Sequence, residues 1–171
     1  EFEKWSTHSL ANRKHKETIL RRQYESSMVR LDIEIDKFGY DKNGIVSPKG
    51  KVLYNKLSDL QKRNRLPIDI DLSMIRINGH IAKESGDISK ADKIWMAGLK
   101  KFWKVKSKSK KTWESAARLR LAQGSYWRTI FERQSLKSNP QKKVALFQKL
   151  EAWNAEAVSY THLRAHETCL D

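Results

Sequence analysis

The sequence predicts an all-α protein, in which a long helical hairpin precedes a compact helical bundle with at most one short β-hairpin. Two observations support this fold class. Apolar residues recur at steps of three and four along most of the chain, which is the period of one helical face. Strand signals are poor, the best being the short pieces Ile45–Val46 and Ile68–Ile70. The predicted domains are an elongated hairpin over 1–66 and a basic bundle over 67–156.

The first predicted helix runs from about Lys16 to Phe38 and is amphipathic. Its apolar stripe consists of Leu20, Tyr24, Met28, Leu31, Ile35 and Phe38. Gly39 is placed to end it, because glycine adopts the left-handed conformation that a helix end often needs. A loop over 39–50 follows, with a small hairpin at Asn43-Gly44.

A second helix begins at Ser47-Pro48, an N-cap followed by proline at the first helical position. Its buried side takes Leu57 and Leu60 together with either Val52 or Leu53. The stretch "NRLPIDID" then breaks the chain before Pro67.

The second half of the chain predicts about five further helices. One runs from about Asp71 to Glu84 with Gly79 weakening it, and Ser85-Gly86-Asp87 ends it and caps the next. That next helix buries a stripe made of Ile88, Ala91, Trp95, Gly98 or Leu99, and Phe102. Trp113–Ala122 is helical, Gly124 interrupts, and Tyr126–Leu136 resumes. Asn139-Pro140 starts the last helix, whose stripe contains Leu146, Leu150 and Trp153.

The tail "VSYTHLRAHET", from Val158 to Thr168, differs from the chain before it. On a helix, His162 and His166 would share one face and could hold a metal ion. The string nevertheless resembles a translated transposase-based sequencing adapter over all its residues. We therefore expect a non-native tail over 157–171, attached to a metagenomic fragment whose natural gene is interrupted near Glu156. A genuine histidine helix is the less favoured alternative.

The composition indicates a polyanionic partner. Lysine and arginine number 35 against 20 acidic residues, a formal net charge of +15. A polyanion best offsets the repulsion among so many cations, and DNA or RNA is the commonest one, ahead of an anionic membrane or an acidic protein. The sequence has no apolar run of about 18 residues and no signal peptide, so we expect no membrane span and a cytoplasmic location, in a bacterial host cell or its equivalent.

Catalytic constellations are absent from the sequence. Outside the tail there is no cysteine, the histidines are His8, His15 and His80, and neither a phosphate-binding loop nor a dinucleotide fingerprint occurs. His80 is interpreted as a packed or partly exposed histidine rather than a general base. Asp32, Glu34 and Asp36 cannot converge on a helix, and capping explains at least one of Asp69 and Asp71. We therefore expect no enzyme, metal or cofactor. A metal-dependent nuclease using Asp32, Asp36, Asp69 or Asp71 is a less favoured alternative.

Basic residues provide the stronger functional signal. Seven lysines lie within the twelve residues 100–111. Phe102 and Trp113 suit helix packing, whereas Trp103 lies off the apolar stripe and suits stacking on a base. The predicted nucleic-acid-binding residues are Lys100, Lys101, Lys104, Lys106, Lys108, Lys110, Lys111, Trp103, Arg118, Arg120, Arg128 and Arg133. Further cations occur at Arg13, Lys14, Lys16, Arg21 and Arg22. The alternative interpretation is a solvated basic face.

Two stretches show family resemblances. "ILRRQYESSMVRLDIEIDKFGYDKNGIVSPKGKVLYNKLSDLQKR", residues 19–63, resembles the helix, loop, proline and second helix of phage small terminase subunits, through Phe38-Gly39, Asn43-Gly44 and Pro48. That resemblance implies a homo-oligomer that binds viral DNA for packaging. "SGDISKADKIWMAGLKKF", residues 85–102, resembles a tetratricopeptide or half-tetratricopeptide repeat, and 126–153 echoes it.

The sequence therefore predicts a non-enzymatic nucleic-acid-binding protein of a phage or mobile element. The resemblance to small terminase subunits implies, more specifically, a DNA-packaging subunit. The alternative is a helical-repeat scaffold for protein–protein interaction, which needs about three repeats at a fixed period.

Overall fold

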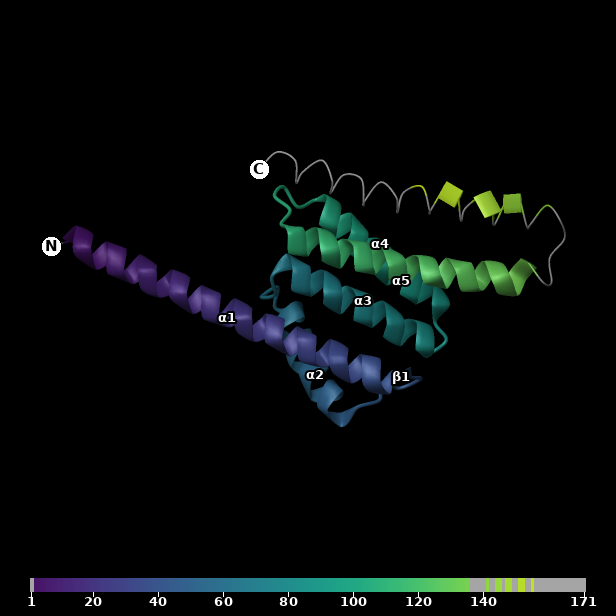
Figure 1. The fold of residues 1–171 in the computed structure, drawn as a ribbon, viewed down its shortest axis with the longest axis horizontal. Coiled ribbons are helices and arrows are strands. Elements are labelled where there is room, and N and C mark those ends of the chain that lie inside the picture. Colours follow the sequence, from purple (N-terminus) through teal and green to yellow (C-terminus); the bar gives the residue numbers. More distant parts are fainter. Residues whose placement is uncertain are drawn as a thin grey trace.

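The structure, a computed structural model, describes residues 2–135, 141, 144–145, 147–148, 151–152 and 155, with side chains in the main range described for 14–125 and 127. The elements follow in the order α1 (Phe2–Phe38), β1 (Tyr40–Asp41), β2 (Gly44–Ile45), α2 (Pro48–Lys62), α3 (Ile68–Glu84), α4 (Ile88–Trp103) and α5 (Lys110–Ser135) (Figure 1). The prediction of an all-α fold with at most one short β-hairpin is confirmed.

Helix α1 spans 37 residues, and its N-terminal half projects from the rest of the molecule (Figure 1). Its C-terminal half packs on α2 and α3, because Met28, Leu31 and Ile35 are buried. Leu20 and Phe38, at the two ends of the predicted stripe, are about half exposed. The apolar stripe therefore buries its centre, and the helix continues as a polar arm.

The hairpin and the start of α2 form as the local signals predict. Gly39 ends α1 with a φ of +73°, and Ser47 caps α2 by accepting a hydrogen bond from the backbone N–H of Gly50 at 3.2 Å. The strands pair Tyr40 with Ile45 and Asp41 with Gly44. The tight turn is thus Lys42-Asn43, one residue earlier than predicted, and Gly44 enters β2 with a φ of +113°.

Helix α3 is central and contributes to two apolar cores. Ile70, Met74 and Ile77 join α1, β2 and α2 in one core, whereas Leu72 and Ala82 join α4 and α5 in the other. Helix α3 begins just after the predicted domain boundary at residue 66, and it packs both on the elements before that boundary and on the helices after it.

Two glycines allow α4 to approach its neighbours closely. A Cβ atom on Gly79 would lie 2.0 Å from Nε1 of the fully buried Trp95, and one on Gly98 would lie 2.7 Å from Ile75 and from Leu119. The Trp95 indole in turn donates to the carbonyl of Arg76 at 3.1 Å. Gly79, expected to weaken α3, is therefore the position that admits Trp95.

The structure settles a weak strand signal and corrects one predicted element. Ile68–Ile70, one of the two best strand candidates in the sequence, is the first turn of α3, which places Ile70 on the same face as the buried Met74 and Ile77. Helix α5 continues through Gly124, which is buried, since glycine costs a helix only about 1 kcal/mol and packing can offset that. The predicted stripe of Leu146, Leu150 and Trp153, and the tail 157–171, lie outside the described residues.

Candidate nucleic-acid interface

The lysine-rich segment 100–111 lies at one end of the bundle of α3, α4 and α5, where α4 ends and α5 begins (Figure 1). Lys100, Lys104, Lys106 and Lys110 are exposed there. Within the part of the chain that the structure describes, no ion pair to a carboxylate is found for these four lysines. Their charges therefore face solvent over the last turn of α4, the connecting loop and the first turn of α5.

An aromatic cluster holds this loop in place. Phe102 and Trp113 are buried with ring centroids 4.8 Å apart, as the packing prediction for both residues requires. Trp103 is 46% exposed, and its ring lies edge-on to Phe102 and to Trp113, with centroids 5.0 and 6.0 Å away. The ammonium of Lys108 donates to the carbonyl of Val105 at 2.7 Å and lies over the rings of Phe102 and Trp103. Lys108 therefore stabilises the loop.

The start of α5 adds positive potential to this end of the molecule. Ser109 precedes the helix, and its hydroxyl accepts from the backbone N–H of Thr112 at 3.3 Å. The first turn contains Lys110 and Lys111 and no acidic residue. Since the N-terminus of a helix already carries partial positive charge, the two ammonium groups raise the potential further.

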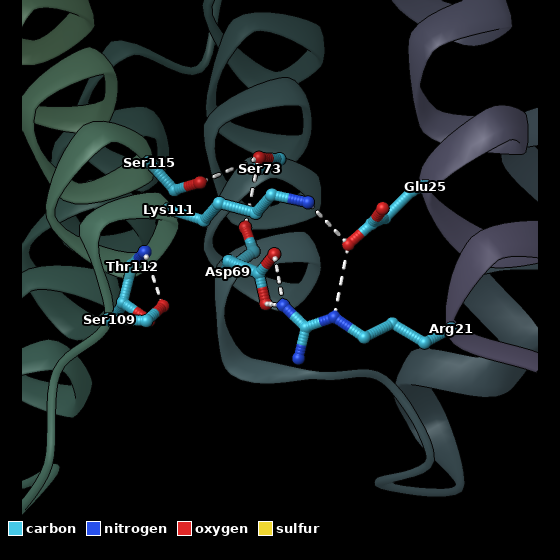
Figure 2. Close-up of polar contacts among 8 residues, drawn as sticks. All are labelled: Arg21, Glu25, Asp69, Ser73, Ser109, Lys111, Thr112 and Ser115. Atoms are coloured by element: carbon cyan, nitrogen blue, oxygen red, sulfur yellow. Dashed lines mark hydrogen bonds and ion pairs between the residues drawn. The ribbon is translucent and has the colours of Figure 1, made fainter. Parts of the chain in front are cut away.

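Lys111 is joined to α1 through a shared carboxylate (Figure 2). Its Nζ lies 2.8 Å from Oε1 of Glu25, which also accepts from Nε of Arg21 at 3.0 Å. The Lys111 ammonium is the main cause that lowers the pKa of Glu25. Arg21 also contacts Asp69 on α3 at 3.3 Å. This network links α1, α3 and α5 at the basic end.

Asp69 and Asp71 are both buried in the first turn of α3, where the helix dipole favours negative charge. Neither caps the helix through its side chain: the N-cap is Pro67, which has no side-chain hydrogen bond, so the capping interpretation is wrong. Asp69 pairs instead with Arg21. Asp71 pairs with Lys101, and its Oδ1 accepts from the Gln61 amide at 2.8 Å.

The predicted arginines do not share one surface. Arg120 is only 5% exposed and donates to Gln123 at 2.6 Å, so it does not belong to the exposed set. Arg118 is exposed, and its charge acts to lower the pKa of Asp32 on α1, although burial raises that pKa overall. Arg128 and Arg133 lie on α5, but their side chains are outside the described residues.

Two members of the acidic trio on α1, Asp32 and Glu34, each have a separate partner. Asp32 pairs with Arg76 at 2.6 Å, and Glu34 accepts a hydrogen bond from the Ser47 hydroxyl. Among the described residues, no group of three histidine, cysteine or acidic side chains is placed to hold a metal ion.

His80 is packed against two aromatic rings. Its ring stacks on Tyr40 at 5.6 Å and meets Trp95 edge-on at 5.4 Å. Burial, followed by the charges of Arg76 and Lys83, lowers the pKa of His80 to about 4. The imidazole is therefore neutral at pH 7.

A groove of about 410 Å³ lies on another face, between α1 and α2. It is lined by Arg30, Ile33, Glu34, Lys49, Val52 and Leu53. Its exposed apolar side chains are Ile33 and Val52. No helix in the described residues is long and apolar enough to cross a membrane.

One basic segment at the candidate interface is not among the nucleic-acid-binding residues predicted from the sequence. The turn between α2 and α3 carries Arg63 and Arg65, both exposed, in the string "QKRNR". The charge cluster is visible in the sequence. Its link to α4 depends on Asp71, which contacts both Gln61 on α2 and Lys101 on α4.

Comparison of the chain with protein-family models, with curated proteins and with solved structures finds no match. The resemblances to small terminase subunits and to tetratricopeptide repeats therefore depend on the sequence stretches quoted above.

Proposed function

We propose that this protein is a non-enzymatic nucleic-acid-binding protein whose exposed lysines in 100–111 contact phosphates. The observation that carries the proposal is the placement of Lys100, Lys104, Lys106 and Lys110 together at one end of the α3–α5 bundle, next to the N-terminus of α5. The nearby carboxylates are already paired with other cations. Glu25 pairs with Arg21 and Lys111, Asp69 pairs with Arg21, and Asp71 pairs with Lys101. The exposed lysines therefore lack internal compensation within the described residues.

Phosphate groups supply that compensation. Each phosphate neutralised by a lysine releases condensed counterions, which drives binding and makes the affinity fall steeply with salt. The half-exposed ring of Trp103 supplies an apolar edge beside the lysines, where it can contact a base or a sugar. The resemblance of 19–63 to phage small terminase subunits supports a role for the protein, as a homo-oligomer, in DNA packaging by a phage or mobile element.

A charge-removal variant tests the proposal. In Lys104→Ala/Lys106→Ala/Lys110→Ala, we expect the affinity for fluorescently labelled nucleic acid, measured by anisotropy at 50 mM salt, to fall at least tenfold. The matched control is Lys42→Ala/Lys51→Ala/Lys56→Ala, which removes three exposed lysines from the hairpin and α2. The proposal fails if the wild-type protein binds neither DNA nor RNA at low salt, or if both variants lose affinity equally.

The helical-repeat scaffold has weaker support. Helices α3 and α4 form one antiparallel pair, and α5 packs on both of them in a shared core. An array needs about three repeats, more than these three helices provide. Protein–protein interaction through a repeat surface is therefore the second candidate.

A further inference from the structure

We propose that the polyanion surface includes two segments besides the lysine-rich loop, namely the α2–α3 turn with Arg63 and Arg65 and the arm of α1 with Lys14, and that its ligand is a double-stranded nucleic acid. This inference depends on the proposed function and deepens it. The three segments are far apart in the sequence, and two carboxylates, the buried Asp71 and the partly exposed Glu25, connect them.

Asp71 connects the α2–α3 turn to the lysine-rich loop. Its carboxylate accepts from Gln61, in the last turn of α2, and pairs with Lys101, in the last turn of α4. Because one carboxylate contacts both helix ends, the last turns of α2 and α4 both lie within side-chain reach of Asp71. Arg63 and Arg65 follow the first of these helix ends, and the chain leaves the second at Lys104, so we place both segments on one surface.

The conformation of the turn is fixed. Asn64 adopts a φ of +52°, a left-handed conformation that asparagine tolerates better than most residues. The backbone N–H of Arg65 donates to the carbonyl of Leu60 at 3.0 Å. Arg63 and Arg65 thus flank an ordered helix end with both side chains exposed, and neither forms an ion pair within the part of the chain described here.

Glu25 connects the α1 arm to the start of α5. It bonds Arg21 on its own helix and Lys111 on α5, and Arg21 reaches Asp69 (Figure 2). Lys14 lies seven residues before Arg21, so it is on the same face of α1 and about 10 Å further along the helix axis. It is exposed. The arm therefore extends the basic surface outward from the lysine-rich loop.

A surface composed of three separate cationic segments fits a duplex better than a single strand. A duplex presents phosphates on two backbones separated by a groove, so several segments of one protein can contact it together. Single-strand sites depend on aromatic rings that stack with successive bases. At this surface the Trp103 ring is edge-packed on Phe102 and Trp113, and Lys108 lies over it. Phosphate contacts therefore dominate.

The test measures binding of the full chain to three labelled probes of equal length: a 20-bp DNA duplex, a 20-bp RNA duplex and a 20-nucleotide oligo(dT). The variant Arg63→Ala/Arg65→Ala is compared with Lys42→Ala/Lys51→Ala, which removes the same charge from the hairpin and the start of α2. At 100 mM salt we expect the arginine variant to lose at least tenfold in duplex affinity, and its plot of log K against log salt to become less steep by about two. The control variant should change by less than threefold.

The outcomes separate this inference from the proposed function. Preference for DNA or RNA duplex identifies which duplex is the ligand, and either supports the inference. Tighter binding of oligo(dT) than of both duplexes overturns it. So does unchanged duplex affinity in the arginine variant, when circular dichroism shows that both variants are folded. In either case the proposed function survives if the Lys104/Lys106/Lys110 variant loses affinity. If no probe binds the wild-type protein, the proposed function itself is wrong.

Discussion

Replacing Gly79 with alanine should destabilise the protein by about 2 kcal/mol. The new Cβ atom would lie 2.0 Å from Nε1, 2.4 Å from Cε2 and 2.5 Å from Cδ1 of Trp95. An ordinary contact is about 3.5–4.0 Å, so the indole must move by about 1.5 Å. Trp95 has no exposed surface and therefore has no solvent-filled space to move into.

The magnitude combines three effects. Overpacking of a filled core typically costs about 1–3 kcal/mol. Moving the indole weakens its hydrogen bond to the carbonyl of Arg76, a further loss of about 1 kcal/mol. Alanine in place of glycine within a helix recovers about 1 kcal/mol. The helix propensity gained with alanine and the hydrogen bond lost by Trp95 nearly cancel, so the overpacking cost remains. The net expectation is a loss of about 2 kcal/mol in the free energy of unfolding.

Urea-induced unfolding, followed by circular dichroism at the helical band, measures this change. Trp95→Phe removes the Nε1 atom that the new methyl group would meet, so Gly79→Ala should cost at least 1 kcal/mol less in that background. Equal costs in the two backgrounds would refute the proposed fit between the glycine and the indole. Unchanged stability of Gly79→Ala in the wild-type background would refute it as well.

Three further changes give expected outcomes. Glu25→Gln should raise nucleic-acid affinity up to about fivefold in anisotropy titrations, because it releases Lys111 and Arg21 from an exposed ion pair; a lower affinity would contradict this. His80 has a folded pKa of about 4 against an ordinary value of 6.5, so the unfolded chain takes up the proton first. The urea concentration at the unfolding midpoint should therefore decrease as the pH is lowered from 6.5 to 5. In His80→Phe the same change of pH should lower it by less. Ser47→Ala removes the α2 cap and should cost about 1 kcal/mol in urea unfolding, and a cost near zero would show that the cap is unimportant.

Local signals predicted much of the fold. The end of α1 at Gly39 and the start of α2 at Ser47 depend on residues that are adjacent in sequence, and both were predicted correctly. The buried stripe of α4 followed from its apolar period, and Ala91, Trp95 and Phe102 are all buried.

Features that depend on distant partners could not be predicted from the sequence. The two-sided burial of α3 depends on helices that precede and follow it, and the helix begins at Ile68, three residues before the predicted start at Asp71. The break expected at Gly124 does not occur, since propensity for a single residue is outweighed by packing along α5.

The candidate site shows the same division. The lysine-rich segment is a local feature and was predicted, but the partners of Lys111 and Lys101 lie on α1 and α3 and were not. Arg120 was included for its charge, whereas it is buried because its position on α5 faces the core. The α2–α3 turn was not predicted, because its connection to the lysine-rich segment runs through the tertiary contacts of Asp71 with Gln61 and Lys101.

The salt dependence of duplex binding tests the central claim most directly. The exposed cations of the lysine-rich loop, the α2–α3 turn and the α1 arm are Lys100, Lys104, Lys106, Lys110, Arg63, Arg65 and Lys14. If each neutralises one phosphate, a plot of log K against log salt should have a slope of about −6. Measurement of that slope by anisotropy between 50 and 300 mM salt should give a straight line close to this value. A slope near zero, or no binding at 50 mM salt, would show that this basic end does not bind a polyanion.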